Sequence, residues 1–339
     1  MTLNPIDGPH IIIRLLEELI MTITQLLGIK YPIFQGAMAQ IAREPLVSAV
    51  SNAGGLGIIG SGGMSAEVLR EEIRKVRAAT SKPFAVNLML MMHNIPELIE
   101  VIVEEKVKIV TTGAGTPAPY MPIFKEHGIK VIAVIPSVKI AKKMEALGVH
   151  AVVAEGTEAG GHVGETTTMA LVPQVVSSVS IPVVAAGGVA DGRGIAAAFA
   201  LGAQGVQVGT RFLTTVECPT HDNFKQAVID ADDTSTTVTG RSLGGPVRSI
   251  KNSMIAEYLK LEQEHATREE LEKISLGSLR KAVFEGDTDR GSVMAGQICG
   301  LCNEITTVEQ MITTMFNEAQ ELLNRLGQTQ ITGEQVASV

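Results

Sequence analysis

The chain contains few cysteines and few aromatic residues, and it has no tryptophan. Its 339 residues include three cysteines, three tyrosines and eight phenylalanines. Three thiols cannot form the disulfide framework of a small secreted domain, so a reducing, cytoplasmic compartment is expected. No apolar run reaches the roughly 20 residues that a membrane-spanning helix requires, so no membrane partner is expected.

Charged residues are also sparse. They make up 19% of the sequence against 45% hydrophobic residues, and the formal net charge is −8. This composition is typical of a globular chain with a sizeable core. It argues against nucleic-acid binding, which requires a basic surface. An acidic partner is still compatible with it, because a local basic patch can oppose the overall sign.

Several familiar catalytic and metal-binding motifs are missing. The sequence has no G-x-S-x-G elbow, no H-E-x-x-H motif and no histidine pair with metal-ligand spacing. One C-x-x-C, "CGLC" at 299–302, has no partner pair, so buried thiols are expected rather than a zinc site. "GLGIIG" at 55–60 matches G-x-G-x-x-G, but a helical pattern precedes it. We therefore interpret it as a helix-to-strand turn. Because the metal-binding motifs above are missing, no metal site is predicted.

What the chain does contain is a regular alternation of short β-branched runs and helical patterns. The expected strands lie at 31–36, 56–60, 83–88, 107–112, 130–135, 150–156, 181–188 and 205–210. They lack polar alternation, as strands buried on both faces do. Eight units of this length predict an α/β fold, a TIM (β/α)8 barrel. A doubly wound sheet is the alternative, although it rarely uses eight evenly spaced units.

The pattern also predicts how the chain is divided. Residues 1–21 are expected to be a leader or N-terminal extension, since Met21 would serve as an alternative start. Residues 22–215 would form the barrel. Residues 216–325 are expected to form an added C-terminal helical region packed on the barrel and capping its mouth. Residues 326–339 would be a tail.

Glycines gather where the predicted strands end. In a TIM barrel these carboxyl ends form the active-site face, and the loops after strands seven and eight usually bind phosphate. Here those loops are "AAGGVADGRG" and "VGTRF". They predict a phosphate site at Gly187, Gly188, Gly209 and Thr210. The alternative is that these glycines only turn the chain.

One histidine stands out in "EAGGHVGETTT" (158–168), after the sixth predicted strand. His162 follows Gly160 and Gly161, which would let it approach a flat ligand closely. An imidazole titrates near neutral pH and is suited to proton transfer, so His162 is the candidate catalytic residue. A histidine that only hydrogen-bonds the backbone is the alternative.

Several of these motifs occur together in one known family. "YPIFQGAM", "PFAVNLML", "VKIVTTGAG", "AEGTEAGGHVG", "IPVVAAGGVADG", "VQVGTRF" and "GDTDRGSVMAGQ" resemble the FMN-dependent enoyl-acyl-carrier-protein reductase II (FabK) family and its relatives, the nitronate monooxygenases. The resemblance runs from about residue 22 to about residue 324. It implies a flavoenzyme, and it makes the predicted phosphate site that of FMN.

The resemblance also implies roles for individual residues. His162 matches the family's catalytic histidine. The cofactor-binding residues it implies are Gly36, Ala37, Met38, Asn87, Glu155, Gly160, Gly161, Gly187, Gly188, Gly209, Thr210, Ser292 and Gln297. Of these, Ser292 and Gln297 are expected to close over the cofactor.

The implied reaction is reduction of the 2,3 double bond of trans-2-enoyl-acyl-carrier-protein thioesters, the last step of the fatty-acid elongation cycle. NADH or NADPH would be the co-substrate, and family members can respond to a monovalent cation. The chemical alternative is a nitronate monooxygenase, which would use FMN, the same histidine and O₂. An alternative from another class is a phosphate-binding barrel without redox chemistry, such as an isomerase.

The expected partner is an acyl carrier protein bearing the enoyl thioester, and a homodimer is expected. The carrier is acidic, so its docking surface would have to be a local basic patch. "GRSLGGPVRSIKN" offers Arg241, Arg248 and Lys251 for it. "LMLMM" at 88–92 offers an adaptable methionine-rich trough for the acyl chain, or ordinary packing of the barrel.

Overall fold

The computed structural model describes residues 21–329. The predicted leader and most of the predicted tail lie outside these residues. Within them, no helix is both long enough and apolar enough to cross a membrane.

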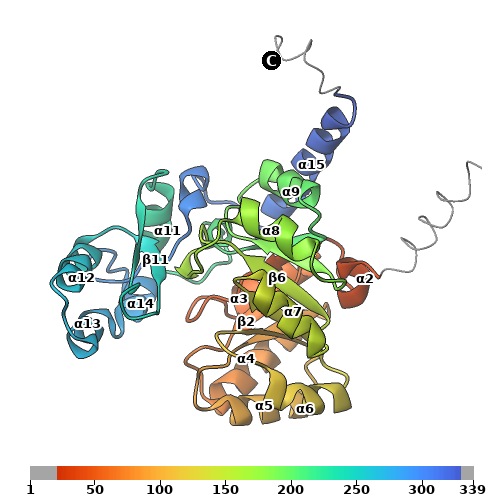
Figure 1. Ribbon diagram of the computed structural model, residues 1–339, viewed down its shortest axis with the longest axis horizontal. Helices are drawn as coiled ribbons and strands as arrows, with labels where there is room; N and C mark the ends of the chain where they lie inside the picture. The colour runs from red at the N-terminus through yellow and green to blue at the C-terminus, as the bar shows by residue number, and fades with distance from the viewer. Residues whose placement is uncertain (1–20, 330–339) are drawn as a thin grey trace, which may run out of the picture.

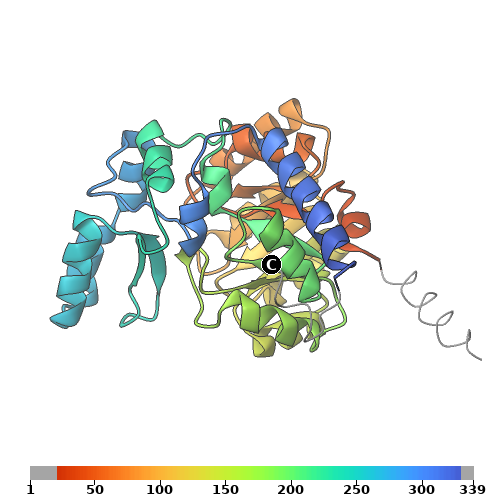
Figure 2. The ribbon, with the colours of Figure 1, turned by 90° about the horizontal axis from the view of Figure 1, so that it is seen from above.

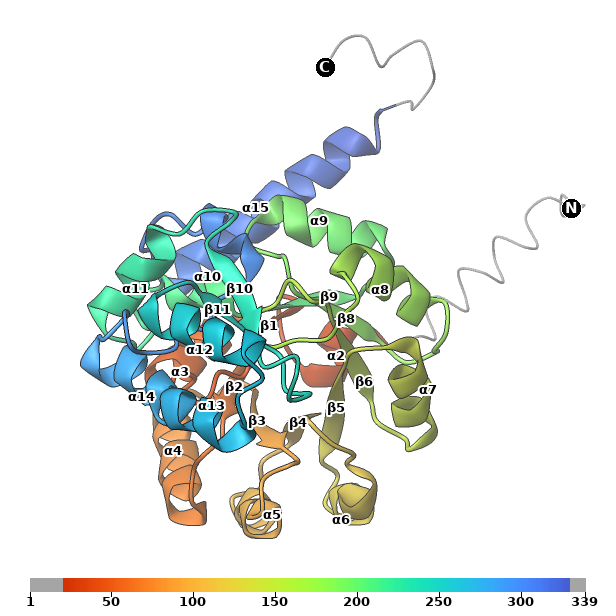
Figure 3. The same cartoon turned by 60° about the vertical axis from the view of Figure 1, so that its left-hand side comes forward.

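Eight parallel strands form one sheet in the order β1-β9-β8-β6-β5-β4-β3-β2. Their bounds are β1 (Ile33–Gln35), β2 (Gly57–Gly60), β3 (Phe84–Met89), β4 (Ile109–Gly113), β5 (Lys130–Ile135), β6 (Ala151–Glu155), β8 (Val183–Ala186) and β9 (Gly205–Val208). Phe34 of β1 also bridges Leu56, just before β2, so the sheet closes on itself. Figure 3 shows these strands ringed by helices. The predicted TIM barrel is confirmed, and a doubly wound sheet is excluded.

Helices cover the outside of the barrel. They are α3 (Glu44–Asn52), α4 (Ala66–Ala79), α5 (Ile95–Glu104), η1 (Ala118–Tyr120), α6 (Met121–Glu126), α7 (Val138–Ala146), α8 (Thr168–Val176), α9 (Gly192–Ala200) and α10 (Thr210–Leu213). The last of these is too short to fill the eighth position. The C-terminal helix α15 (Val308–Leu326) fills it instead, because it packs against α9 and α3 (Figure 2).

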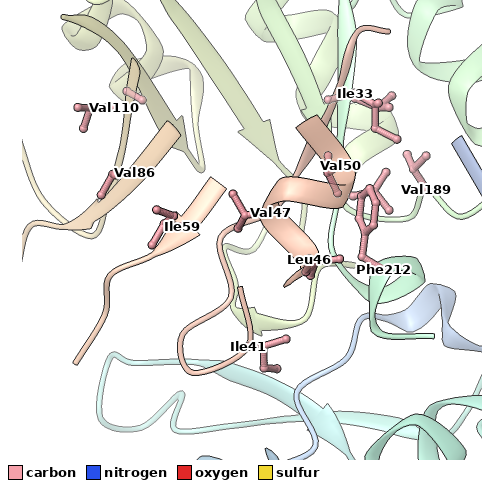
Figure 4. Close-up of a cluster of buried hydrophobic side chains, with 14 of the residues drawn as sticks. Ile33, Ile41, Leu46, Val47, Val50, Ile59, Val86, Val110, Val189 and Phe212 are labelled. Carbon is pink, nitrogen blue, oxygen red and sulfur yellow. The ribbon is translucent and has the colours of Figure 1, made fainter. Parts of the chain in front are cut away.

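The strands are buried on both faces, as their apolar sequences predict. Ile33 points outward into the layer beneath the helices, whereas its neighbour Phe34 points into the barrel. This alternation is the ordinary period of a strand. Figure 4 shows part of the outer layer, where Val47 and Val50 of α3 lie beside Ile33 and Ile59. The short helix α2 (Ile23–Leu27) contributes Ile23 and Leu27 to the inner cluster.

The segment "GLGIIG" is the predicted helix-to-strand turn. Helix α3 ends at Asn52 and β2 begins at Gly57. A Cβ on Gly57 would lie 2.1 Å from the carbonyl oxygen of Val47. Glycine therefore allows α3 to pack directly on β2, and this stretch binds no dinucleotide in the manner of the fingerprint.

Residues 216–306, here called the cap, stand beside the barrel (Figure 1). The cap contains α11 (Asp222–Ile229), β10 (Thr236–Thr239), β11 (Val247–Ile250), α12 (Ser253–Gln263), α13 (Arg268–Ser275), α14 (Ser278–Arg280), η2 (Lys281–Glu285) and η3 (Gln297–Leu301). The prediction of helices and loops alone was wrong here. Strands β10 and β11 form a hairpin, and β11 pairs with β7 (Gly161–His162) of the barrel.

Candidate active site

A cavity of about 610 Å³ lies at the carboxyl ends of the barrel strands, where the cap meets the barrel. Both parts contribute to its wall. The sequence-predicted residues that line it are Gly36, Ala37, Met38, Asn87, Glu155, Gly160, Gly161, His162, Gly187, Gly188, Gly209 and Thr210. The structure thus brings together at one end of the barrel nearly all the residues that the sequence singled out.

Glycine backbone forms one side of the cavity. Gly187 and Gly188 have φ angles of +95° and +76°, which only glycine adopts without strain. No protein acceptor within residues 21–329 takes the backbone N–H of Gly188 or of Gly209, the N-cap residue of α10. Unpaired N–H groups that line a cavity are suited to hold an anion such as a phosphate.

His162 lies in the loop that follows β6, within the two-residue strand β7. Its backbone pairs with Val247 of β11, and its side chain is exposed at the cavity wall. Desolvation by the surrounding wall lowers the pKa of the imidazole below its ordinary value. The neutral imidazole therefore predominates at pH 7. It can donate a hydrogen bond from its N–H or accept a proton.

Two carboxyl groups face the same cavity in different states. Burial raises the pKa of Glu155, at the end of β6, to about 7. Glu158 is instead held by the start of α8, where its carboxylate oxygens accept from the Thr168 backbone N–H and hydroxyl at 2.9 Å. Glu155 can thus donate a hydrogen bond to a ligand as a carboxylic acid, whereas the acceptor oxygens of Glu158 already have protein donors.

A polar pair fixes the cavity wall beside β3. The Asn87 side-chain amide donates to the hydroxyl of Thr111 on β4 at 3.0 Å, and both residues line the cavity. This hydrogen bond fixes the orientation of the Asn87 amide, so the amide oxygen can accept a hydrogen bond from a ligand.

The rest of the wall is apolar, and the sequence predicted it only in part. Of the "LMLMM" run, Met89 reaches the cavity, whereas the Met91 side chain is 67% exposed outside it. Met294 and Ile298 of the cap line the cavity and were missed. The motif "GSVMAGQ" pointed to this segment, but spacing could not tell which of its side chains turn inward.

Ser292 and Gln297 do not line the cavity, and their closure over a cofactor stays a prediction. The Ser292 hydroxyl is buried and lies 3.0 Å from that of Ser278. The Gln297 side chain is exposed, and its backbone N–H donates to the carbonyl oxygen of Glu158 at 2.9 Å. Both residues hold the cap in shape.

The predicted docking patch also needs a correction. Arg241 and Lys251 are exposed, but Arg248 is only 6% exposed. Its guanidinium turns inward because β11 places it against the loop of His162. Arg248 therefore cannot meet a protein partner at the surface.

The cysteines behave as predicted. Cys218, Cys299 and Cys302 are free and buried, and burial raises the pKa of Cys302 to about 12. No cluster of three or more His, Cys, Asp or Glu side chains suited to a metal ion occurs among the described residues.

Comparison with known proteins places this geometry in a family. The sequence model of nitronate monooxygenase matches residues 21–98 and 92–318. A probable nitronate monooxygenase of Staphylococcus saprophyticus is 34% identical over 89% of this chain and 98% of its own length. A 5-hydroxy-7a-methyl-1-oxo-octahydro-1H-indene-4-carboxyl-CoA dehydrogenase of Rhodococcus jostii is 31% identical over 90% of this chain and 97% of its own.

Among solved structures, FabK from Thermotoga maritima superposes with a TM-score of 0.88. It is 47% identical to this chain, and the match covers 90% of this chain and 97% of that one. The matched family is one of oxidoreductases, so the isomerase alternative is set aside.

Proposed function

Because the chain belongs to the nitronate monooxygenase family of oxidoreductases, we propose that it is an FMN-dependent enoyl-acyl-carrier-protein reductase. The observation that carries the proposal is the cavity of about 610 Å³ at the barrel mouth, whose wall combines glycine backbone, His162 and methionines. The 47% identity to FabK, against 34% and 31% to the monooxygenase and the dehydrogenase, favours the reductase within the family.

The residues present fit FMN. The unpaired N–H groups near Gly188 and Gly209 would hold the phosphate. Gly36 lines the cavity without a side chain, so a flat ring could lie against its backbone. Asn87 and the protonated Glu155 would hydrogen-bond the polar edge or the ribityl chain.

FMN, when bound, supplies the relay of hydride between a nicotinamide and the substrate. The sum of the reaction is enoyl thioester plus NAD(P)H plus a proton, giving the saturated thioester and NAD(P)⁺. His162 would contribute as the neutral imidazole, because its pKa is lowered by burial. Its N–H can hydrogen-bond the thioester carbonyl oxygen, where negative charge develops, and it can pass a proton from water to Cα.

The apolar wall would receive the acyl chain. Met38, Met89 and Met294 line the cavity, and thioether side chains adapt to ligands of different shape. The exposed Arg241 and Lys251 remain candidates for contact with an acidic acyl carrier protein. A homodimer and a response to monovalent cations remain part of the proposal.

Steady-state electron flow tests the proposed reaction. The FMN-loaded chain is mixed with crotonyl thioester and either NADH or NADPH, and nucleotide absorbance is followed with and without the thioester. We expect thioester-dependent nucleotide consumption and formation of butyryl thioester. Nucleotide consumption that is equal with and without thioester would overturn the proposal.

A nitronate monooxygenase is the second candidate, and the lowered pKa of His162 favours it too, because a neutral imidazole can act as a base. Its signature would be oxygen uptake with an alkyl nitronate in the absence of nucleotide. This result, together with no turnover of crotonyl thioester, would replace the first proposal by the second.

A further inference from the structure

The loop that carries His162 is held partly by its own contacts with the start of α8 and partly by cap residues that are distant in sequence. Gly161 and His162 pair with Arg248 and Val247 of β11. The Val163 N–H donates to the carbonyl oxygen of Pro246 at 3.2 Å. The conformation of this barrel loop therefore depends on the cap hairpin β10–β11.

The side chain of Arg248 reinforces this contact. Its Nε and one terminal nitrogen donate to the carbonyl oxygen of Thr157 at 3.2 and 3.1 Å, and the other terminal nitrogen donates to the hydroxyl of Thr236 at 3.0 Å. One planar guanidinium thus ties the start of the His162 loop to both strands of the hairpin. Lysine cannot make these hydrogen bonds to Thr157 and Thr236 together, because its single ammonium lacks the planar set of donors of a guanidinium.

Arg248 is an unusual residue for so enclosed a place. Only 6% of it is exposed, and within residues 21–329 its guanidinium makes no direct ion pair, although the Glu158 carboxylate lies near enough to attract it. Removing a charge from water without a direct ion pair is costly, so packing alone does not account for an arginine here. Arg248 also does not line the cavity, so it acts on a ligand only through the loop.

We propose that Arg248 is a positioning residue, whose grip on the Thr157 carbonyl holds the loop so that the His162 imidazole faces the cavity. Two other cap contacts act on the same loop. The Gln297 N–H holds the Glu158 carbonyl, and Gly160 lies against the backbone of Ala295 and Gly296. Neither of these spans the hairpin, so Arg248 alone links the loop to both of its strands.

Substitution of Arg248 by methionine tests the proposal in the FMN-loaded enzyme. Arg248→Met keeps a long apolar stem but loses the donors, and Arg248→Lys keeps the charge but loses the fork. Arg290→Met is the matched control, since Arg290 is a cap arginine whose exposed side chain pairs with Glu257 and not with the hairpin or the His162 loop. The inference rests on the proposed function for its kinetic readout but not for its spectroscopic one.

The spectroscopic readout is the pH titration of the His162 ring signal, identified by its loss in His162→Ala. The other titratable side chains lining this cavity are Glu155 and Glu158. In Arg248→Met we expect the apparent pKa of His162 to rise toward the ordinary value, because a loosened loop moves the ring away from the wall that desolvates it. Arg290→Met should titrate as the wild type does, and Arg248→Lys should lie between.

The kinetic readout is turnover of crotonyl thioester. We expect kcat to fall by about 10- to 100-fold in Arg248→Met, as displacement of a reacting group by about 1 Å does, with the KM for nucleotide unchanged. An unaltered His162 titration in a folded Arg248→Met protein would overturn the inference. If Arg248→Met does not fold, Arg248→Lys decides by the same titration. If no variant, including the wild type, reduces the thioester, the proposed function fails while the titration still tests Arg248.

Discussion

The barrel and the cap are built differently, although they share one cavity. Every barrel strand is buried on both faces, and its side chains belong to two large apolar clusters. The cap helix α13 buries only Leu271, and Leu276 beside it is 85% exposed. The barrel therefore has the larger hydrophobic stabilisation, while the cap fixes the position of the loop that carries His162. The barrel thus supplies most of the cavity wall, and the less densely packed cap positions the loop that carries His162.

The largest predicted effect is that of replacing His162, the barrel residue whose loop pairs with the cap. His162→Ala should lower enoyl turnover by about 10²–10⁴-fold, the usual contribution of a proton-transferring or polarising group. FMN affinity, measured by fluorescence of released flavin, should change little. His127→Ala, at the exposed C-terminal end of α6, is the control.

The pH profile sharpens this prediction. The pKa of His162 is lowered, so neutral imidazole, the form we propose to be active, should persist down to pH values below its ordinary pKa of about 6.5. Activity should then stay level from neutrality down through pH 6.5 and fall only at lower pH, where the imidazole becomes protonated. A rate that falls as pH rises through neutrality would instead make the imidazolium the active form.

The sequence predicted the barrel well and the cap poorly for a physical reason. A strand such as "HAVVAEG" is buried on both faces, so its apolar residues mark it without reference to its neighbours. "TTVT" and "VRSI" of the cap are short and largely polar, and the second pairs with the first and with Gly161 and His162 of the barrel loop. Pairing between segments about 85 residues apart leaves no local signal.

The same contrast between barrel and cap explains which site residues could be predicted from the sequence. Gly187, Gly188 and His162 were predictable, because strand ends converge on one face of a TIM barrel. The inward turn of Met294 and Arg248 depends on cap packing, which no spacing reveals. The packing of α15 against the barrel was also missed, because the pattern of an amphipathic helix does not indicate which surface its apolar face covers.

A second prediction concerns a buried acid of the barrel. The pKa of Glu155 is raised to about 7 in the folded chain, against about 4.3 when unfolded. Its contribution to stability is present below pH 4.3 and is lost as pH rises toward 7, because the unfolded state ionises first. Between pH 4.5 and 7.5 the FMN-free wild type should lose about 3 kcal/mol relative to Glu155→Gln in urea unfolding. Parallel pH dependence of the two proteins would contradict the raised pKa.

A third prediction concerns the contact between barrel and cap. A Cβ on Gly160 would lie 2.7 Å from the Ala295 carbonyl carbon and 2.8 Å from the Gly296 nitrogen. Gly160→Ala should therefore destabilise the protein by about 1–3 kcal/mol and weaken FMN binding, as backbone must move. In the hairpin turn a Cβ on Gly245 meets nothing within 4 Å, so Gly245→Ala should be neutral. Equal unfolding midpoints for both variants would mean that the cap does not press on this loop.

The smallest predicted effect lies within the cap. The Ser249 hydroxyl is buried without a hydrogen-bond partner, whereas that of Ser292 pairs with Ser278. Ser249→Ala should be neutral or stabilise by up to about 1 kcal/mol, and Ser292→Ala should destabilise by a similar amount. Chemical denaturation of the two variants distinguishes these signs. A clear loss of stability in Ser249→Ala would indicate a partner for this hydroxyl, such as ordered water.

Anaerobic single-turnover spectroscopy tests the central claim most directly. Enzyme-bound FMN is first bleached with one equivalent of NADH or NADPH, and crotonyl thioester is then added in the absence of oxygen. The account predicts that the nucleotide bleaches the flavin and that the thioester restores its absorbance with formation of one equivalent of butyryl thioester. Flavin that stays bleached until oxygen is admitted would contradict it.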